Sequence, residues 1–293
     1  MSEPATTYPL PRLALETTLL THGVPRSAAL PLARELADIC RSHGTLPALC
    51  GVVRGQLVAG MTDAHLQAML DEPGGVPKLN TSSLDAAAAQ KRSGATTVST
   101  TIQLAAMRGI RVFSTGGLGG VHKGYAQHLD ISTDLLALAR WPVAVVTAGC
   151  KSILDVTATR ELLETLGVPI IGYKTDRFPA FYQRDGGCTV DARFDDMHAL
   201  AAFVRKTLMT SQRGVVIANP ISAQEELSTI DWQTWLTQAE AHARASGATG
   251  RDITPATLGA LHTISNGRTL TANIALVKHN VHIGAQLAAA IER

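Results

Sequence analysis

Residues 111–151 read RVFSTGGLGGVHKGYAQHLDISTDLLALARWPVAVVTAGCK, and this stretch decides the fold. An apolar run with strand character leads into residues 115–124, where five of the ten residues are glycine. A polar turn at residues 130–134 then opens a helix, and a second apolar strand at residues 143–147 ends shortly before Lys151. This spacing is typical of one strand–helix–strand unit in a parallel sheet.

The same alternation of strands and helices extends outward over the first three quarters of the chain. Further short apolar runs predict strands, at residues 13–15, 46–53, 56–60, 168–173 and 214–218. An α/β fold with a mainly parallel sheet covered by helices is therefore expected. Helices dominate after residue 230 and should wrap that body, and residues 178–182 read as a packed aromatic turn. Without a linker or an internal repeat, residues 1–293 form one expected domain.

Composition narrows the classes of partner and the cellular compartment. Of the 293 residues, 45% are apolar and 17% are charged, which is ample for a core. The net charge of +2 comes without a basic block, which argues against nucleic acid as a partner. No apolar run has the length of a membrane span, and no signal-peptide core is present. The four cysteines lack CxxC spacing, so a reduced cytoplasm fits best.

The glycine-rich stretch does not match the common nucleotide-binding motifs. A dinucleotide fingerprint starting at Gly117 needs a glycine where His122 stands, and no P-loop sequence is present. One interpretation is a glycine-rich crossover between a strand and a helix. We favour an anion cradle, because Thr115, His122 and Lys123 flank the glycines with hydrogen-bond donors.

Three carboxylates each allow two interpretations. Asp130 and Asp134 are four residues apart near a helix start, so they could cap the helix or bind a hard divalent cation. Helix capping is favoured by the pattern alone. Glu16 follows the first predicted strand and is either a solvated turn residue or a placed acid–base group. Composition alone favours the solvated residue.

Two lysines and a run of hydroxyl groups are likewise ambiguous. Lys151 follows an apolar strand and small residues, where poor solvation favours a neutral amine suited to Schiff-base chemistry. Its alternative is a lysine reaching solvent at a sheet edge. Lys78 reads as a surface group, and the hydroxyls of residues 96–101 could be caps, back-bonded side chains or ligands for a sugar or phosphate.

Taken as a set, the motifs are specific. The matching stretches cover nearly the whole chain in order: residues 14–18, 21–23, 94–98, 109–124, 130–135, 148–155, 167–169, 218–221 and 272–277. In these stretches the chain resembles the pseudouridine-5′-phosphate glycosidase family, also called the indigoidine synthase A-like family.

The resemblance implies a three-layer α/β/α fold, a homotrimer, a divalent metal that is typically manganese, and chemistry at C1′ of ribose 5-phosphate. By match, Lys151 is the Schiff-base lysine, Glu16 is the general acid–base, and Asp130 is the metal ligand, acting partly through waters. Other positions match substrate-binding residues of the family: Lys78, Thr97, Val98, Thr115, His122, Ser132, Thr133, Asp134 and Asn273.

Elementary chemistry agrees with these roles. A C-glycosidic carbon is a poor leaving group, so hydrolysis through an oxocarbenium ion is difficult. A lysine amine bonded to C1′ can stabilise this carbon as an iminium while the C–C bond breaks, and Glu16 can protonate the departing aromatic carbon. In reverse, Lys151 condenses with the open-chain aldehyde, and an electron-rich aromatic carbon attacks the iminium.

One segment departs from the family pattern. Family members usually carry Ser-Arg-Arg-Asp-Leu-Pro where this chain has residues 80–85, NTSSLD. The loss of two arginines removes strong anion or base contacts. The aromatic partner is therefore either uracil, which we favour slightly, or a planar polyketide, as in antibiotic pathways of the alnumycin type. A phosphosugar-binding module without catalysis is disfavoured, because Glu16, Asp130 and Lys151 are all present.

Overall fold

One ten-stranded sheet forms the centre of the computed structural model, which describes residues 10–247 and 253–292. Its strand order is β11-β8-β12-β7-β6-β1-β2-β5-β4, and β3 pairs with β2. The strands are β1 (Arg12–Leu15), β2 (Leu46–Val53), β3 (Gln56–Ala59), β4 (Lys78–Leu79), β5 (Gly94–Thr96), β6 (Val112–Ser114), β7 (Ala144–Thr147), β8 (Ile170–Tyr173), β11 (Ala192–Phe194) and β12 (Val215–Ala218).

The predicted parallel sheet is confirmed. All neighbours from β11 to β2 are parallel, and so are β4 and β5. Within the described strands of this sheet, only β2 pairs in the antiparallel sense, with β3 and with β5. The central strands β7, β8 and β12 are buried along their whole length, which explains why they read as unbroken apolar runs.

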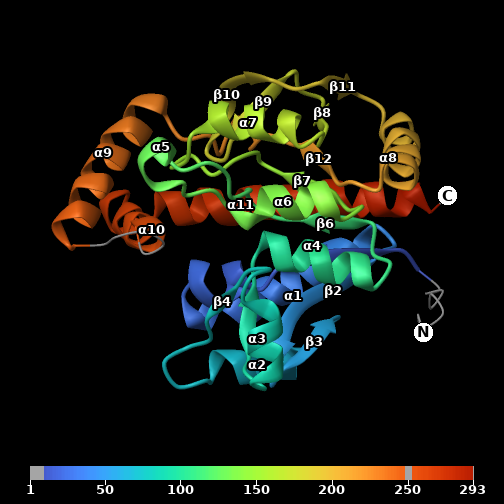
Figure 1. Cartoon of the computed structure of the whole chain (residues 1–293), viewed down its shortest axis with the longest axis horizontal. Helices are drawn as coiled ribbons and strands as arrows, with labels where there is room; N and C mark the ends of the chain where they lie inside the picture. Colours follow the sequence, from blue (N-terminus) through green and yellow to red (C-terminus); the bar gives the residue numbers. More distant parts are fainter. Residues whose placement is uncertain (1–9, 248–252, 293) are drawn as a thin grey trace.

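Helices cover both faces of the sheet, as expected for three layers (Figure 1). They are α1 (Arg26–Ser42), α2 (Asp63–Leu70), α3 (Leu84–Ala89), α4 (Val98–Met107), α5 (Tyr125–His128), α6 (Thr133–Arg140), α7 (Val156–Thr165), α8 (Met197–Ser211), α9 (Thr229–Ala245), α10 (Ile253–Ile264) and α11 (Arg268–Ile291), with a π-helix at Leu19–Gly23. One core cluster joins the sheet to α1, α8, α9 and α11, and a second joins it to α4, α6 and α7. Within the described part of the chain, no helix combines the length and apolarity needed to cross a membrane.

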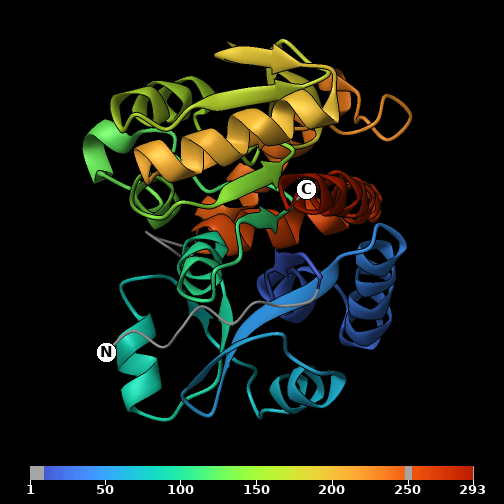
Figure 2. The same ribbon diagram turned by 90° about the vertical axis from the view of Figure 1, so that its right-hand side faces the viewer.

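The C-terminal helix does more than wrap the body. Figures 1 and 2 show α11, in red, crossing the middle of the molecule. It packs directly against β1, β6 and β7, and its inner face is buried from Ala272 to Ile291. Polar residues on that face of α11 therefore lie next to the strands that carry the predicted site.

The expected aromatic turn at residues 178–182 is confirmed for Phe181 and Tyr182, which form the buried turn of a hairpin, whereas residues 178–180 belong to a strand. Strands β9 (Arg177–Ala180) and β10 (Gln183–Thr189) pair in the antiparallel sense. Phe181, between them, takes a positive φ of 58° and is buried. The prediction missed the strands because β9 is short and contains a proline, and β10 contains two adjacent glycines and no apolar alternation.

Candidate active site

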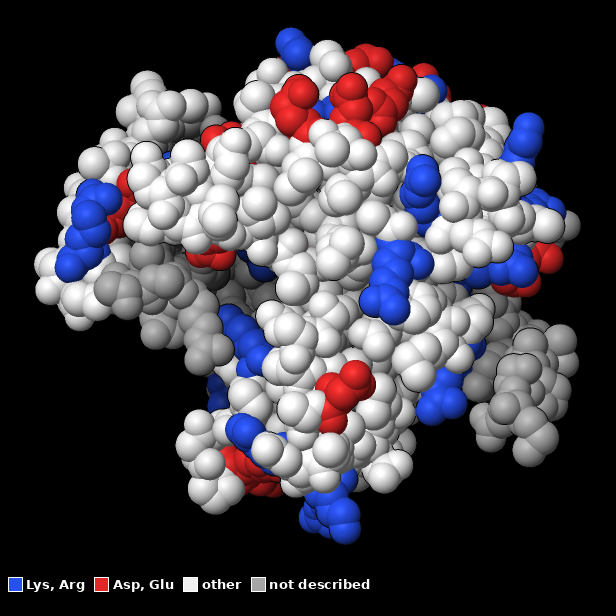
Figure 3. Space-filling view, viewed as in Figure 1, with Lys and Arg blue, Asp and Glu red and all other residues white. Residues whose placement is uncertain are grey.

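The predicted reactive residues meet at the carboxyl edge of the parallel sheet. Leu15 of β1 pairs with Ser114 of β6, so the next residues, Glu16 and Thr115, leave the sheet side by side. Lys151 follows the end of the next strand, β7. Figure 3 shows the molecular face hollowed between the part that carries α5 and the part that carries β4, with basic side chains on the lower rim. Ligands of open α/β sheets bind at this edge.

Hydroxyl groups hold the Glu16 carboxyl and anchor the two residues that follow it. The Thr115 hydroxyl donates a hydrogen bond to Oε1 of Glu16. Thr17 donates to a carbonyl of β2 over 2.9 Å, and Thr18 donates to the last carbonyl of β5 over 2.7 Å. The chain then enters the π-helix Leu19–Gly23, a conformation that is frequent at functional sites. The sequence ETT thus fixes the carboxyl group rather than leaving it in a solvated turn.

The charges around Glu16 form one cluster. Burial raises the pKa of Glu16 above its ordinary value, and Asp134 raises it further, while Lys151, the Thr115 hydroxyl and Lys78 oppose the rise. Burial and the nearby Lys151 lower the pKa of Lys78, against the opposing effect of Glu16. A carboxyl whose pKa is raised beside two lysines is suited to donating a proton near an amine nucleophile.

Of the two adjacent nucleophilic residues after β7, Cys150 and Lys151, only Lys151 is a candidate for the nucleophile. The preceding thiol, Cys150, is fully buried, and burial raises its pKa to about 12, so it remains unreactive. The Lys151 amide donates to the carbonyl of Leu118 over 3.0 Å, which anchors the backbone to the glycine-rich loop. Gly149 takes a positive φ of 80° against the Pro179 carbonyl, an approach that no side chain permits.

The glycine-rich loop is not an open anion cradle, which corrects our interpretation. Residues 116–121 are buried. The Gly119 amide donates over 2.8 Å to the Asp134 carboxylate, whose other oxygen accepts from the Ser99 amide over 2.9 Å. A side chain at Gly119 would collide with Ser132. The loop does hold an anion, but that anion is the chain's own Asp134.

Hydroxyl groups collect where α4 and α6 begin. The Ser99 hydroxyl lies 3.0 Å from those of Thr97 and Thr133, and Ser132 caps α6 by accepting from the Asp134 amide. Val98 is buried in the core, so only its backbone can face a ligand. Two helix N-termini with hydroxyls form a natural anion site. Ser99 was not predicted individually, although the hydroxyl-rich run at residues 96–101 is its signal.

Asp130 and His122 form a pair of their own. The His122 amide donates to the Asp130 carbonyl over 3.0 Å, and the ring Nδ1 lies 3.6 Å from the carboxylate. Asp134 does not face the same point, and Ser132 rather than either aspartate caps α6, which corrects the capping interpretation. In the described ranges no group of three or more His, Cys, Asp or Glu side chains could hold a metal. One partly exposed carboxylate fits a Mg²⁺- or Mn²⁺-type ion that keeps several waters.

Other residues lie around this edge. The side chain of Asn273 on α11 faces the start of the loop, because a Cβ added at Gly116 would lie 3.3 Å from its Oδ1. His22, in the π-helix, was not predicted to have a role; burial and Lys78 lower its pKa, so it lies near the cluster. Lys123 points away and binds Glu240 of α9 over 3.2 Å, so its predicted part in an anion cradle was wrong.

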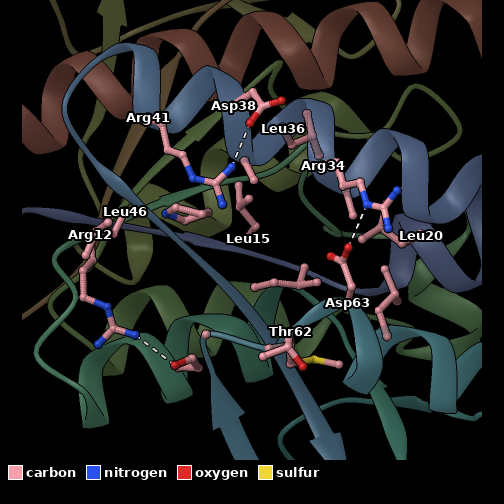
Figure 4. A pocket seen from close by; sticks show the side chains of 18 residues that line it. Arg12, Leu15, Leu20, Arg34, Leu36, Asp38, Arg41, Leu46, Thr62 and Asp63 are labelled. Atoms are coloured by element: carbon pink, nitrogen blue, oxygen red, sulfur yellow. Dashed lines mark hydrogen bonds and ion pairs between the residues drawn. The ribbon is translucent and has the colours of Figure 1, made fainter.

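A cavity of about 810 Å³ lies apart from this cluster (Figure 4). It is lined by α1, α2 and the strands β1 and β2, and two ion pairs stand at its rim, Arg34–Asp63 and Arg41–Asp38. Among the described lining residues there is no predicted site residue, although Leu15 directly precedes Glu16. The cavity is therefore separate from the reactive edge.

The fold and the site define an α/β protein whose reactive groups gather at the carboxyl ends of parallel strands. The chain belongs to the family described as indigoidine synthase A-like protein, whose model matches residues 3–290. The resemblance in the motifs is thereby confirmed.

Relatives of known name cover nearly the whole chain. A pseudouridine-5′-phosphate glycosidase of Methylobacterium nodulans is 44% identical, over 96% of this chain and 83% of its own. A second pseudouridine-5′-phosphate glycosidase, of Symbiobacterium thermophilum, is 43% identical, over 96% of this chain and 93% of its own.

Two solved structures are similar. An indigoidine synthase A-like protein from Thermotoga maritima has a TM-score of 0.89 and 35% identity, covering 97% of this chain and 94% of its own. The prealnumycin C-glycosynthase AlnA, in complex with ribulose 5-phosphate, has a TM-score of 0.88 and 34% identity, covering 96% and 91%.

Proposed function

We propose that this protein is an enzyme that reversibly cleaves the C–C bond between C1′ of ribose 5-phosphate and an aromatic base, with uracil as the base. The observation that carries the proposal is the cluster of Glu16, Lys151 and Lys78, in which a partly buried carboxyl with a raised pKa adjoins two amines. The glycosidases named among its relatives, which are more than 40% identical over almost the whole chain, support the same activity.

The proposed reaction divides between two residues. In cleavage, the Lys151 amine bonds to C1′, the bond from C1′ to the ring oxygen breaks, and a proton from the attacking amine passes to that oxygen. The nitrogen lone pair then forms the iminium as the C–C bond breaks, and Glu16 donates a proton to the departing aromatic carbon. Water hydrolyses the iminium, which releases ribose 5-phosphate and the free lysine. Synthesis runs the same steps backwards, with Glu16 accepting the proton.

The phosphate of the substrate is proposed to lie at the N-termini of α4 and α6. Hydroxyls of Thr97, Ser99 and Thr133 are linked there, where α4 and α6 begin, and helix N-termini favour anions. Lys78 would add positive charge from β4. Asp134 acts as an anchor, since its carboxylate joins the amides of α4 and the glycine-rich loop.

Asp130 is proposed to hold a divalent ion, with manganese as the expected metal. Its carboxylate is partly exposed and its pairing with His122 is loose, so water can fill the remaining positions of the ion. When bound, such an ion supplies positive charge near the sugar phosphate. His122 then orients the carboxylate, and Asn273 would contact the base from α11.

A second function differs only in the aromatic partner. The chain would attach ribose 5-phosphate to a planar polyketide, as a biosynthetic C-glycosynthase for an antibiotic. Two observations favour it: the residues NTSS at 80–83 lack the two arginines of the family pattern, and the prealnumycin C-glycosynthase AlnA has a similar structure.

The protein is further proposed to assemble as a homotrimer. Large apolar side chains are exposed around α5 and α6, including Leu129 at 77% and Leu136 at 61%, and a partner subunit would cover them. Light scattering of the purified protein measures this directly, and a monomer at micromolar concentration would contradict it.

One experiment tests the activity and separates the two partners. The protein is incubated with ribose 5-phosphate and Mn²⁺, together with either uracil or a planar phenolic polyketide, and the C-riboside is sought by mass spectrometry. The uracil product supports the first function, and the polyketide product supports the second. Binding of ribose 5-phosphate with neither product would instead indicate a phosphosugar-binding module without catalysis.

A further inference from the structure

Two buried asparagines stand behind the reactive edge. Asn219 directly follows β12 and is 3% exposed, and Asn280, in the middle of α11, is 0% exposed. The Asn219 side-chain amide donates to Oδ1 of Asn280 over 2.8 Å. In turn, Nδ2 of Asn280 donates to the carbonyl of Thr115 over 2.8 Å, and more weakly to that of Gly116 over 3.4 Å.

This polar pair is not what a core needs for packing. Burying an amide is costly unless all its groups are paired, whereas a leucine of similar size at position 280 would need no partner. The neighbouring inner positions of α11 are apolar, among them Leu276, Val277 and Val281. A fully paired polar contact fixes one geometry, which an apolar contact does not.

The geometry that the pair fixes is the end of β6. The backbone of Thr115 is held on one side by its amide, which donates to Val146 of β7 over 3.0 Å. Its carbonyl is held by Asn280, and its hydroxyl donates to Glu16. Asn280 lies seven residues, or about two helical turns, after Asn273, so one face of α11 serves both positions.

We propose that Asn280, held by Asn219, is a positioning residue that directs the Thr115 hydroxyl at Glu16 and so orients the catalytic acid. The inference rests on the proposed function in one respect, the role of Glu16 as that acid. As far as the structure describes the chain, the side-chain hydrogen bonds of Asn280 go to Asn219, Thr115 and Gly116, and not to Glu16 or Lys151. Its loss should therefore impair the step that needs Glu16 and spare the step that needs only the lysine.

The test compares two rates in the variant Asn280→Ala. Cleavage of pseudouridine 5′-phosphate should fall about tenfold or more, since a displaced catalytic group loses rate steeply. Borohydride trapping of ribose 5-phosphate on Lys151 should stay within about twofold of wild type. Asn219→Ala should show a smaller loss of cleavage, because Asn280 still reaches Thr115.

Thr269→Ala is the matched control. Thr269 is also on α11, is 0% exposed, and its hydroxyl bonds to Ser265 and His262, away from the reactive edge. It should lower the melting temperature without changing the ratio of the two rates. A fall of both rates by the same factor in Asn280→Ala, as expected for general loosening, would overturn the proposal.

A second readout needs no substrate. The Thr115 hydroxyl lowers the pKa of Glu16, so a carbon-detected NMR titration of that carboxyl should give a higher pKa in Asn280→Ala than in wild type. The charges facing Glu16, those of Lys151, Lys78 and Asp134, are unchanged in the variant. An unchanged pKa would overturn the proposal even if the wild type cleaves nothing, whereas failure of the proposed function appears as a wild type without adduct or cleavage.

If Asn280→Ala does not fold, Asn280→Asp keeps the size of the side chain. The aspartate can still accept from Asn219, but when ionised it cannot donate to the Thr115 carbonyl. The same separation of the two rates is expected, and wild-type cleavage in this variant would contradict the positioning role.

Discussion

The Thr115 hydroxyl donates a hydrogen bond to the Glu16 carboxyl, across the ends of two neighbouring parallel strands. The pairing of Leu15 with Ser114 sets this contact, since the next residue on each strand lies at the same edge of the sheet. The bond engages Oε1 of the carboxyl. The bond orients the carboxyl and lowers its pKa, whereas burial raises the pKa and outweighs that effect.

Lys151 should form the covalent adduct. Borohydride added with ribose 5-phosphate is expected to trap the sugar on Lys151, because its amine adjoins Glu16 and Lys78 at the site. Peptide mass mapping locates the adduct. Lys151→Ala should lose cleavage, while Lys123→Ala, which removes a surface lysine bound to Glu240, should keep it. Adducts confined to other lysines, with Lys151→Ala fully active, would exclude the Schiff-base mechanism.

Glu16 should act on the aromatic carbon and not on the sugar. Imine formation requires only the lysine and a proton relayed by water, so Glu16→Gln should still yield the borohydride-trapped adduct. Its C–C bond turnover should fall roughly a hundredfold or more, as for other lost general acid–base groups. Steady-state cleavage and trapping are measured on the same preparation. Equal loss of both would mean that Glu16 also serves the imine step.

Glu16 should also make stability depend on pH. Its folded-state pKa lies above the unfolded value of 4.5, so the ionised form is disfavoured in the fold. The stability contribution of Glu16 is therefore complete below pH 4.5 and is lost as the pH rises through the folded pKa. Glu16→Gln has no group that ionises here, so it lacks this loss. The difference in free energy of unfolding between Glu16→Gln and wild type, measured in urea, should therefore favour the variant more at pH 7.5 than at pH 4. The same difference in free energy of unfolding at both pH values would contradict the raised pKa.

Substitution of the two aspartates near α6 should have different effects, on metal binding for Asp130 and on stability for Asp134. Asp130→Ala is expected to lose the divalent ion and most activity while keeping its fold, because its carboxylate is partly exposed. Asp134→Ala should destabilise the protein by about 1–3 kcal/mol for each of the two buried amides left without an acceptor. Metal analysis and urea unfolding distinguish the variants. Full metal occupancy in Asp130→Ala would show that its role is structural.

The fold was predictable where a local sequence pattern has one physical explanation, such as burial of a strand or close approach of the backbone. Unbroken apolar runs revealed the buried strands β7 and β12, and the glycines after β6 revealed a backbone crowded by its neighbours. The anion beside those glycines was not predictable, because the contact between Gly119 and Asp134 depends on how α6 packs. The same holds for Asn280, which sits in an apolar helix and whose partners are more than sixty positions away. Polar contacts between residues far apart in the sequence produce no periodic pattern of apolar residues, so sequence analysis cannot detect them.

The segment after Lys78 should decide the aromatic partner. The Asn80 side chain accepts hydrogen bonds from the Ser82 amide over 3.1 Å and from the Ser82 hydroxyl over 2.7 Å. The polar groups of this turn therefore bond to one another, at the place where the family pattern has two arginines. If those arginines bind the nucleotide, the double variant Thr81→Arg/Ser82→Arg should lower KM for pseudouridine 5′-phosphate about tenfold, the effect of one hydrogen bond to a charged group.

The control for charge is Thr210→Arg/Ser211→Arg, which adds the same two charges at the exposed end of α8 and should leave KM unchanged. The wild type itself is expected to cleave pseudouridine 5′-phosphate, since the departure touches one short turn and leaves Glu16 and Lys151 in place. Negligible cleavage together with efficient ribosylation of a phenolic polyketide would reverse the choice of partner. The roles of Glu16 and Lys151 would survive that result, because both partners offer an electron-rich aromatic carbon to the same iminium.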